Sequence, residues 1–210
     1  MMLKYLFFDL DGTLVDSSKG INNAFHYTFS KLDMPVPDEA TLSTFIGPPL
    51  ETTFSHFFDN PTQIEQAIAF FRDYYQEKGI HEVRLYDDIA FALEALSQSY
   101  QLFVTTSKHE LSAHQMLKAL EVDSYFTAVY GSTPQRFVKE DVIAACLDEH
   151  NITPNRAAII GDTKFDMIGG KKRGIDCIGV TWGFGEEDDL VQHGASTIVA
   201  SPKDLITHLT

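Results

Sequence analysis

The sequence is poor in cysteine and lacks an apolar run of membrane-spanning length. Cys146 and Cys177 are the two cysteines of 210 residues, and they fall in a helical pattern and a strand pattern. We interpret both as buried apolar residues, because two cysteines make no disulfide framework. The apolar run from Met1 to Leu10 is too short to predict a signal peptide or a membrane span, and Lys4 interrupts it. We therefore expect a cytoplasmic protein without a membrane partner.

Basic residues are also few. The chain has 16 lysines and arginines against 30 aspartates and glutamates, which gives a formal net charge of −14 at pH 7. Proteins that bind nucleic-acid polymers normally present a basic patch to the phosphate backbone, so this charge argues against such a partner. Nucleotides stay possible as small substrates. The length and the 44% hydrophobic content predict one sizeable core with a small appendage.

Two aspartates follow the first apolar run. Residues 5–8 predict a buried strand, and Asp9 and Asp11 stand at its carboxyl end, where open α/β sheets bind their ligands. Gly12 lets the chain turn, so that both carboxylates converge on one point. Two like charges at such a short distance oppose each other's ionisation unless a cation or a proton lies between them. Mg²⁺ is one such cation, and it prefers carboxylate oxygens. The alternative interpretation is a strand-end turn stabilised by aspartate, without a ligand.

A second apolar strand ends in acids in the same way. Residues 157–161 predict a strand, Asp162 follows it, and Asp166 lies one helical turn further on. If a helix begins near Thr163, its dipole favours both anions at the N-terminal end. In the alternative interpretation, Asp162 is only the N-cap of that helix. Two parallel strands that end in acids would gather the four aspartates around one metal ion.

A third predicted strand ends in hydroxyls. Residues 101–105 are followed by Thr106 and Ser107, whose hydroxyls suit phosphate oxygens. Alternatively, one of the two caps the helix that begins near His109. Lys139 opens an amphipathic stretch, and its ammonium group would supply a point charge to phosphate. A lysine at a helix start is more often solvated. Lys139 is a candidate because it lies, along the sequence, between the strand that ends in hydroxyls and the second strand that ends in acids.

The chain between the first acidic strand and residue 79 predicts helices only. Apolar residues recur at helical spacing from Ile21 to Leu32, and Asn60-Pro61 starts a helix that Gly79 ends. We assign most aromatic residues of this insertion, between 45 and 75, to its core. From about residue 87, helices alternate with strands near 101–105, 126–130, 157–161 and 176–180, which predicts a parallel sheet. We therefore predict an α/β fold, with a Rossmann-like parallel sheet core over 1–16 and 80–210 and an inserted helical domain over 17–79.

These residues together resemble the four ordered motifs of the haloacid dehalogenase superfamily. The motifs are residues 9–17 (Asp-Leu-Asp-Gly-Thr-Leu-Val-Asp-Ser), 106–108 (Thr-Ser-Lys), Lys139, and 161–166 (Gly-Asp-Thr-Lys-Phe-Asp). Within the superfamily the chain is most similar to the phosphoglycolate phosphatase and 5′-nucleotidase-like branch, on residues 14–17, 45–50 and 85–89. Motif three differs, with Lys139-Glu140 where phosphoglycolate phosphatases commonly have Lys-Pro. The resemblance implies that the insertion is a C1-type helical cap.

The resemblance also implies a phosphatase reaction on a small phosphorylated substrate. Asp9 would attack the phosphorus of a phosphomonoester to give an aspartyl-phosphate, and Asp11 would protonate the leaving group and then activate water. The implied cofactor is Mg²⁺, and its implied ligands are Asp9, the main-chain carbonyl of Asp11, Asp162 and, directly or through water, Asp166. The implied phosphate-binding residues are Thr106, Ser107 and Lys139.

Three alternatives accompany this interpretation. A phosphomutase of the β-phosphoglucomutase type has the same two aspartates in its first motif. A phospho-accepting receiver domain also gathers acids and Mg²⁺ at a parallel sheet, but it lacks the helical insertion and the second acid two residues after the phosphorylated one. A non-catalytic binding module is the third. True haloacid dehalogenases lack an acid at the position of Asp11, so the resemblance excludes them. The sequence predicts no particular substrate or oligomeric state.

Overall fold

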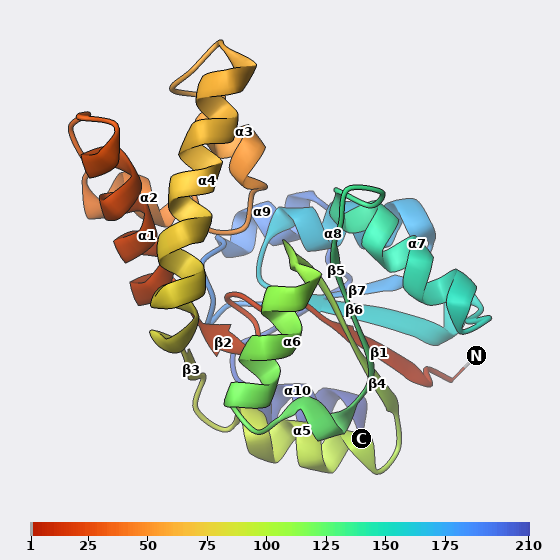
Figure 1. Ribbon diagram of the computed structural model, residues 1–210. Helices are drawn as coiled ribbons and strands as arrows, with labels where there is room; N and C mark the ends of the chain where they lie inside the picture. Colours follow the sequence, from red (N-terminus) through yellow and green to blue (C-terminus); the bar gives the residue numbers. More distant parts are fainter. Residues whose placement is uncertain (1) are drawn as a thin grey trace. The chain divides into compact units, whose positions relative to one another are not determined.

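The computed structural model describes residues 2–210 and divides into two compact units (Figure 1). The first unit runs to Asp16 and resumes over Leu85–Thr210, and the second is the segment Ser17–Arg84 between them. Two short strands, β2 (Val15–Asp16) and β3 (Arg84–Leu85), pair in a sheet of their own where the chain passes from one unit to the other. Each unit has its own hydrophobic core.

The first unit is built on a six-stranded parallel sheet. Its strands, in spatial order, are β5 (Phe126–Ser132), β4 (Gln101–His109), β1 (Tyr5–Phe8), β6 (Ala157–Gly161), β7 (Asp176–Val180) and β8 (Thr197–Val199). In β1, Phe8 is paired with Val104 of β4 on one side and with Ile160 of β6 on the other. The chain builds β4 and β5 on one side of β1 and then β6 to β8 on the other, so ligands are expected at the carboxyl ends of these central strands. The predicted α/β fold with a parallel sheet is confirmed.

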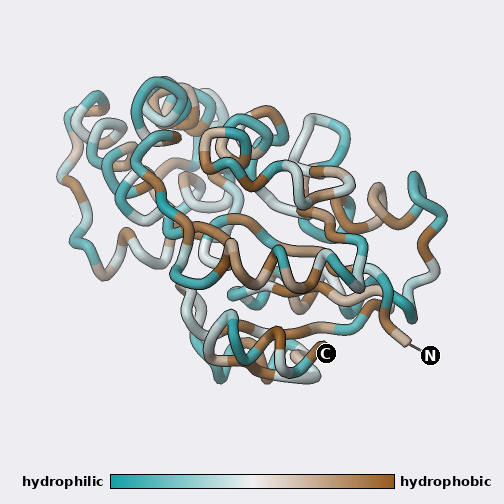
Figure 2. The backbone as a smooth tube through the Cα atoms, turned by 90° about the horizontal axis from the view of Figure 1, so that it is seen from below, coloured by the Kyte–Doolittle hydropathy of each residue, from teal (hydrophilic) through white to brown (hydrophobic). Residues whose placement is uncertain are grey.

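Helices cover both faces of this sheet. They are α5 (Ile89–Ser97), α6 (Glu110–Ala119), α7 (Lys139–Glu149), α8 (Lys164–Arg173), α9 (Glu187–Gln192) and α10 (Pro202–Leu209), with short 3₁₀ helices at Asp123–Tyr125 and Pro154–Arg156. The pair α7 and α8 packs over one face, and the pair α5 and α10 over the other (Figure 1). Because both faces are covered, the central strands are continuous apolar runs, which Figure 2 shows as brown stretches through the middle of the fold.

Several local features differ from the prediction or refine it. Strand β4 continues past residue 105 to His109, and the short strands β2, β3 and β8 were not predicted, because two or three residues carry no readable periodicity. Cys146 and Cys177 are free and buried, as predicted, and burial raises the pKa of the Cys177 thiol to about 11. None of the helices within residues 2–210 has the length and apolar character of a membrane span.

The second unit is a small helical domain with an aromatic core. Its helices are α1 (Ser18–Lys31), α2 (Glu39–Ser43), α3 (Leu50–Phe54), α4 (Pro61–Glu77) and the 3₁₀ helix Gly79–His81. The ring of Phe25 in α1 makes edge contacts with Phe45 and Phe71, at centroid distances of 5.3 and 4.8 Å. The eight aromatic residues between 45 and 75 are all buried or half-buried, as expected of a core. The 3₁₀ helix packs on α1, so the unit continues beyond residue 79 to Arg84.

The aromatic core gives a direct test of stability. Phe25 is fully buried, so Phe25→Ala should lower the free energy of unfolding by about 3–5 kcal/mol through lost burial and a cavity. Phe91 in α5 is 57% exposed, and Phe91→Ala should change it by no more than about 0.5 kcal/mol. Urea unfolding followed by circular dichroism measures both. Equal losses in the two variants would contradict the assignment of Phe25 to a packed core.

Candidate active site

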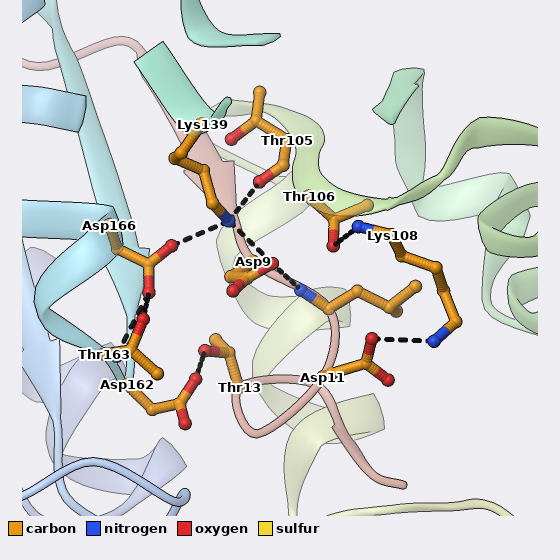
Figure 3. Close-up of polar contacts among 11 residues, drawn as sticks. Asp9, Asp11, Thr13, Thr105, Thr106, Lys108, Lys139, Asp162, Thr163 and Asp166 are labelled. Carbon is orange, nitrogen blue, oxygen red and sulfur yellow. Dashed lines mark hydrogen bonds and ion pairs between the residues drawn. The ribbon is translucent and has the colours of Figure 1, made fainter. Parts of the chain in front are cut away.

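A buried lysine lies at the centre of the carboxyl edge of the sheet (Figure 3). Lys139 is the first residue of α7, and its side chain is only 4% exposed. Its Nζ is 2.8 Å from Asp9 Oδ1 and 2.7 Å from Asp166 Oδ1, and it donates to the carbonyl oxygen of Thr105 at 2.9 Å. The three contacts match the three N–H donors of an ammonium group. The alternative of a solvated lysine at a helix start is therefore wrong.

The charges around Lys139 perturb one another. Burial, followed by the negative charge of Asp166, raises the pKa of Asp9 to about 6, and Lys139 opposes this shift. Burial works to lower the pKa of Lys139, but Asp166 and Asp9 outweigh it and raise that pKa above its usual value. The lysine therefore stays protonated, and its positive charge favours the ionised form of Asp9.

Asp166 is held by the first turn of α8. Thr163 is the N-cap of this helix, and its backbone N–H and its hydroxyl donate to Asp166 Oδ2 at 3.1 and 2.9 Å. This arrangement is a capping box, which satisfies N-terminal donors of the helix. One oxygen of Asp166 thus serves the helix and the other contacts Lys139. The predicted start of the helix near Thr163 is correct.

Asp162 has a different environment. It is fully buried directly after β6, and its Oδ1 accepts from the Thr13 hydroxyl at 2.8 Å while its Oδ2 accepts from the Phe184 backbone N–H at 2.9 Å. The alternative that Asp162 is only a helix N-cap is wrong, because Thr163 takes that position. Burial, then the charges of Asp166 and Asp9, raise the pKa of Asp162 well above its usual range. The sequence interpretation missed Thr13 and Phe184, which lie far from Asp162 along the chain.

Asp11 contacts a second lysine. Its Oδ2 lies 2.7 Å from Lys108 Nζ, and the two side chains are 15% and 9% exposed. Figure 3 shows the Asp11 side chain pointing toward Lys108, whereas Asp9 points toward Lys139. The two carboxylates of the first motif therefore pair with different lysines. The sequence-based prediction that they converge on one point is wrong for their side chains. Lys108 belongs to the second motif, and the sequence predicts no role for it.

The hydroxyl residues of the second motif lie within β4, ahead of the next helix. Helix α6 begins at Glu110 with His109 in the N-cap position. The alternative that Thr106 or Ser107 caps this helix is therefore wrong. The Thr106 hydroxyl is buried and accepts from the Lys108 backbone N–H at 3.2 Å. Ser107 is half-buried, and its role as a phosphate ligand stays a prediction.

The donor set fits a hard divalent cation. Asp9, Asp162 and Asp166 each offer one carboxylate oxygen, and these oxygens lie within 4.8 Å of one another. Three carboxylates against the single positive charge of Lys139 leave an excess of two negative charges when all are ionised. Carboxylate oxygens are the ligands that Mg²⁺ prefers, and a cation would offset this excess. The Asp11 side chain lies outside this group of three.

Fold and site together define a class of protein: an α/β protein with three buried carboxylates and a buried lysine at the carboxyl ends of parallel strands, where such sheets bind their ligands. Residues 6–180 match the family of haloacid dehalogenase-like hydrolases. A 5′-nucleotidase from Pseudomonas aeruginosa is 37% identical over 193 residues, which are 90% of this chain and 87% of that protein. A phosphoglycolate phosphatase from Colwellia psychrerythraea is 26% identical over 201 residues, 90% of this chain and 89% of that protein.

Solved structures agree with this assignment. A haloacid dehalogenase-like hydrolase from Streptococcus pneumoniae superposes with a TM-score of 0.95 at 45% identity, and the match covers 99% of each chain. The chain belongs to the haloacid dehalogenase-like hydrolase family. It is an enzyme of the phosphatase type, and the resemblance found in the sequence is confirmed.

The central lysine can be tested without any substrate. Lys139→Met would leave two buried carboxylates without their cation, so in the presence of a chelator it should lower the free energy of unfolding by about 3–5 kcal/mol. The matched control is Lys164→Met, because Lys164 pairs with Asp189 at 3.0 Å and both side chains are at least 40% exposed. Lys164→Met should lower the free energy of unfolding by no more than about 1 kcal/mol. Urea unfolding of both variants checks the difference, and similar losses would contradict the central role of Lys139.

Proposed function

We propose that this chain is a magnesium-dependent phosphatase that hydrolyses a small phosphomonoester through an aspartyl-phosphate on Asp9. The observation that carries the proposal is the buried ammonium group of Lys139, which bridges Asp9 and Asp166 at 2.8 and 2.7 Å. A phosphoryl group brought to Asp9 meets this fixed positive charge, and such preorganised charge supplies most of the catalysis in phosphoryl transfer. When bound, Mg²⁺ would reduce the repulsion between the carboxylates and the phosphate.

The nucleophile is oriented through one of its two oxygens. Asp9 Oδ1 accepts from the Leu10 backbone N–H at 2.7 Å and contacts Lys139, so Oδ2 is the oxygen we assign to the attack on phosphorus. In the first step, the bond from Asp9 to phosphorus forms, the ester P–O bond breaks, and Asp11 gives a proton to the leaving oxygen. In the second step, Asp11 takes a proton from water, the water oxygen attacks phosphorus, and inorganic phosphate leaves Asp9.

The second motif serves the phosphate and the proton carrier. The Thr106 oxygen accepts from the Lys108 N–H, so its own hydroxyl proton is left to donate to a phosphoryl oxygen. Ser107 is the neighbouring candidate donor. Lys108 holds Asp11 at 2.7 Å and keeps this carboxylate ordered near the end of β4. We propose that the pair separates when Asp11 takes up a proton, which Asp11 then gives to the leaving group in the first step and regains from water in the second.

A 5′-mononucleotide is the substrate we favour. The relative from Pseudomonas aeruginosa that is named a 5′-nucleotidase is 37% identical to this chain over 193 residues. The third motif reads Lys139-Glu140, whereas phosphoglycolate phosphatases commonly have Lys-Pro, so phosphoglycolate is the second candidate. A cytoplasmic location stays a prediction.

The two acids of the first motif should have separable roles. Asp9→Asn should abolish turnover, because the nucleophile is lost. Asp11→Asn should lower the steady-state rate roughly 10²- to 10⁴-fold, the range of general acid–base catalysis, while still permitting slow phosphorylation of Asp9. Release of inorganic phosphate from 5′-nucleotides with Mg²⁺ measures both, and it also separates hydrolysis from transfer by a mutase. Asp188→Asn, in the exposed run that starts α9, is the control. Full activity of either motif variant, or in excess chelator, would refute the mechanism.

Substrate choice is proposed to lie in the helical unit Ser17–Arg84, since the residues assigned to the chemistry all belong to the other unit. Within the helical unit, Arg72 is half-exposed beside a hollow of about 430 Å³ that Ile64 and Ile68 also line. Arg72→Ala should change the ratio of kcat/KM between 5′-nucleotides and phosphoglycolate, with little effect on p-nitrophenyl phosphate. Lys31→Ala, which removes an ammonium group over the Tyr27 ring, is the control. Equal slowing of all three esters by Arg72→Ala would contradict a selective role.

A further inference from the structure

Three segments of the first unit meet around Asp162 with their backbones in close contact. They are the turn after β1, the start of α8 and the loop 181–186 that follows β7. A Cβ atom on Gly183 would overlap the carbonyl oxygen of Gly12, and one on Gly185 would overlap the carbonyl oxygen of Asp162. Glycine is therefore required at both positions of the loop, because it alone permits this approach.

The loop 181–186 reaches the Asp162 carboxylate by two routes. The Phe184 backbone N–H donates directly to Asp162 Oδ2 at 2.9 Å. On the other route, the indole Nε1 of Trp182 donates to the carbonyl oxygen of Thr13 at 2.9 Å, and the Thr13 hydroxyl donates to Asp162 Oδ1 at 2.8 Å. Each oxygen of this carboxylate is thus fixed from a different side, and Trp182 holds the residue that fixes one of them.

We infer that Trp182 is a positioning residue for the phosphoryl-transfer site. Its indole N–H fixes the turn between Asp11 and Val15, and through Thr13 it sets the orientation in which Asp162 faces a cation. Indole is a donor only, so its single hydrogen bond to the Thr13 carbonyl has one defined direction. The consequence for catalysis rests on the proposed function, whereas the hold on the turn is a property of the protein alone.

Trp182→Phe tests the inference because it keeps an aromatic ring and removes the donor. The Kd for Mg²⁺, measured by calorimetry with the metal alone, should rise about 5- to 10-fold, the effect of one lost hydrogen bond. The kcat for p-nitrophenyl phosphate should fall by a similar factor, while KM changes less than about twofold. Tyr100→Phe is the matched control, since it removes a hydrogen bond from a ring to the carbonyl oxygen of Leu209, next to the amino end of β4. It should leave Kd and kcat unchanged.

A second variant shows whether Trp182 acts through Thr13. Thr13→Val removes the hydroxyl and retains the carbonyl, so it should weaken Mg²⁺ binding at least as much as Trp182→Phe. The double variant of Trp182→Phe and Thr13→Val should raise the Kd for Mg²⁺ little more than Thr13→Val alone, because both changes break the same route. The effects of Trp182→Phe and Tyr100→Phe on this Kd should add. In metal-free protein, amide hydrogen exchange of Phe184 should speed up in Trp182→Phe and stay unchanged in Tyr100→Phe.

The outcomes separate this inference from the proposed function. If Asp162→Asn loses Mg²⁺ affinity while Trp182→Phe retains both the affinity and the slow exchange of Phe184, the inference is wrong and the proposed function stands. If exchange speeds up in Trp182→Phe but the wild-type protein binds no Mg²⁺, the proposed function is wrong and the hold of Trp182 on the turn stands. Equal effects of Trp182→Phe and Tyr100→Phe on every readout would reduce Trp182 to a general stabilising residue and overturn the inference.

Discussion

The arrangement of side chains at the carboxyl edge of the sheet depends on the contacts of the buried ammonium group of Lys139. This group connects α7, the end of β1, the first turn of α8 and a carbonyl of β4 through three contacts of 2.7–2.9 Å. Without it, Asp9 and Asp166 would be buried like charges with no cation between them. The stem of the lysine passes over Gly169 of α8, where a Cβ would lie 2.9 Å from Lys139 Cγ.

The three acids of this edge have different partners and therefore different tasks. Both oxygens of Asp166 are engaged, one by Lys139 and one by the Thr163 cap, so this residue chiefly holds the helix and the lysine in place. Asp162 accepts from a neutral hydroxyl and a backbone amide. Burial raises the pKa of Asp162 well above its usual range, and neutral donors offset its buried negative charge less than a cation does.

The site is assembled from loops that follow parallel strands, and the sheet fixes the geometry of those loops. Strands β1, β4, β6 and β7 are neighbours or near neighbours in one sheet, so the chain that leaves each of them emerges at the same edge. The turn after β1 also leads into the helical unit through β2. Because this turn carries Asp11 and Thr13, the start of the insertion and part of the site belong to one short segment.

The sequence by itself determined the parallel sheet, the helical insertion and the two acidic strand ends, because strands buried on both faces must be apolar throughout and Asp9 and Asp162 interrupt that pattern. Tertiary structure alone decided which charges pair. Lys139 looks like an ordinary solvated lysine until the ends of β1 and β4 and the first turn of α8 surround it, and nothing in the sequence pairs Lys108 with Asp11. Pairing depends on distance in space, and residues such as Thr13 and Trp182, 169 positions apart along the chain, meet only when the sheet brings their loops together.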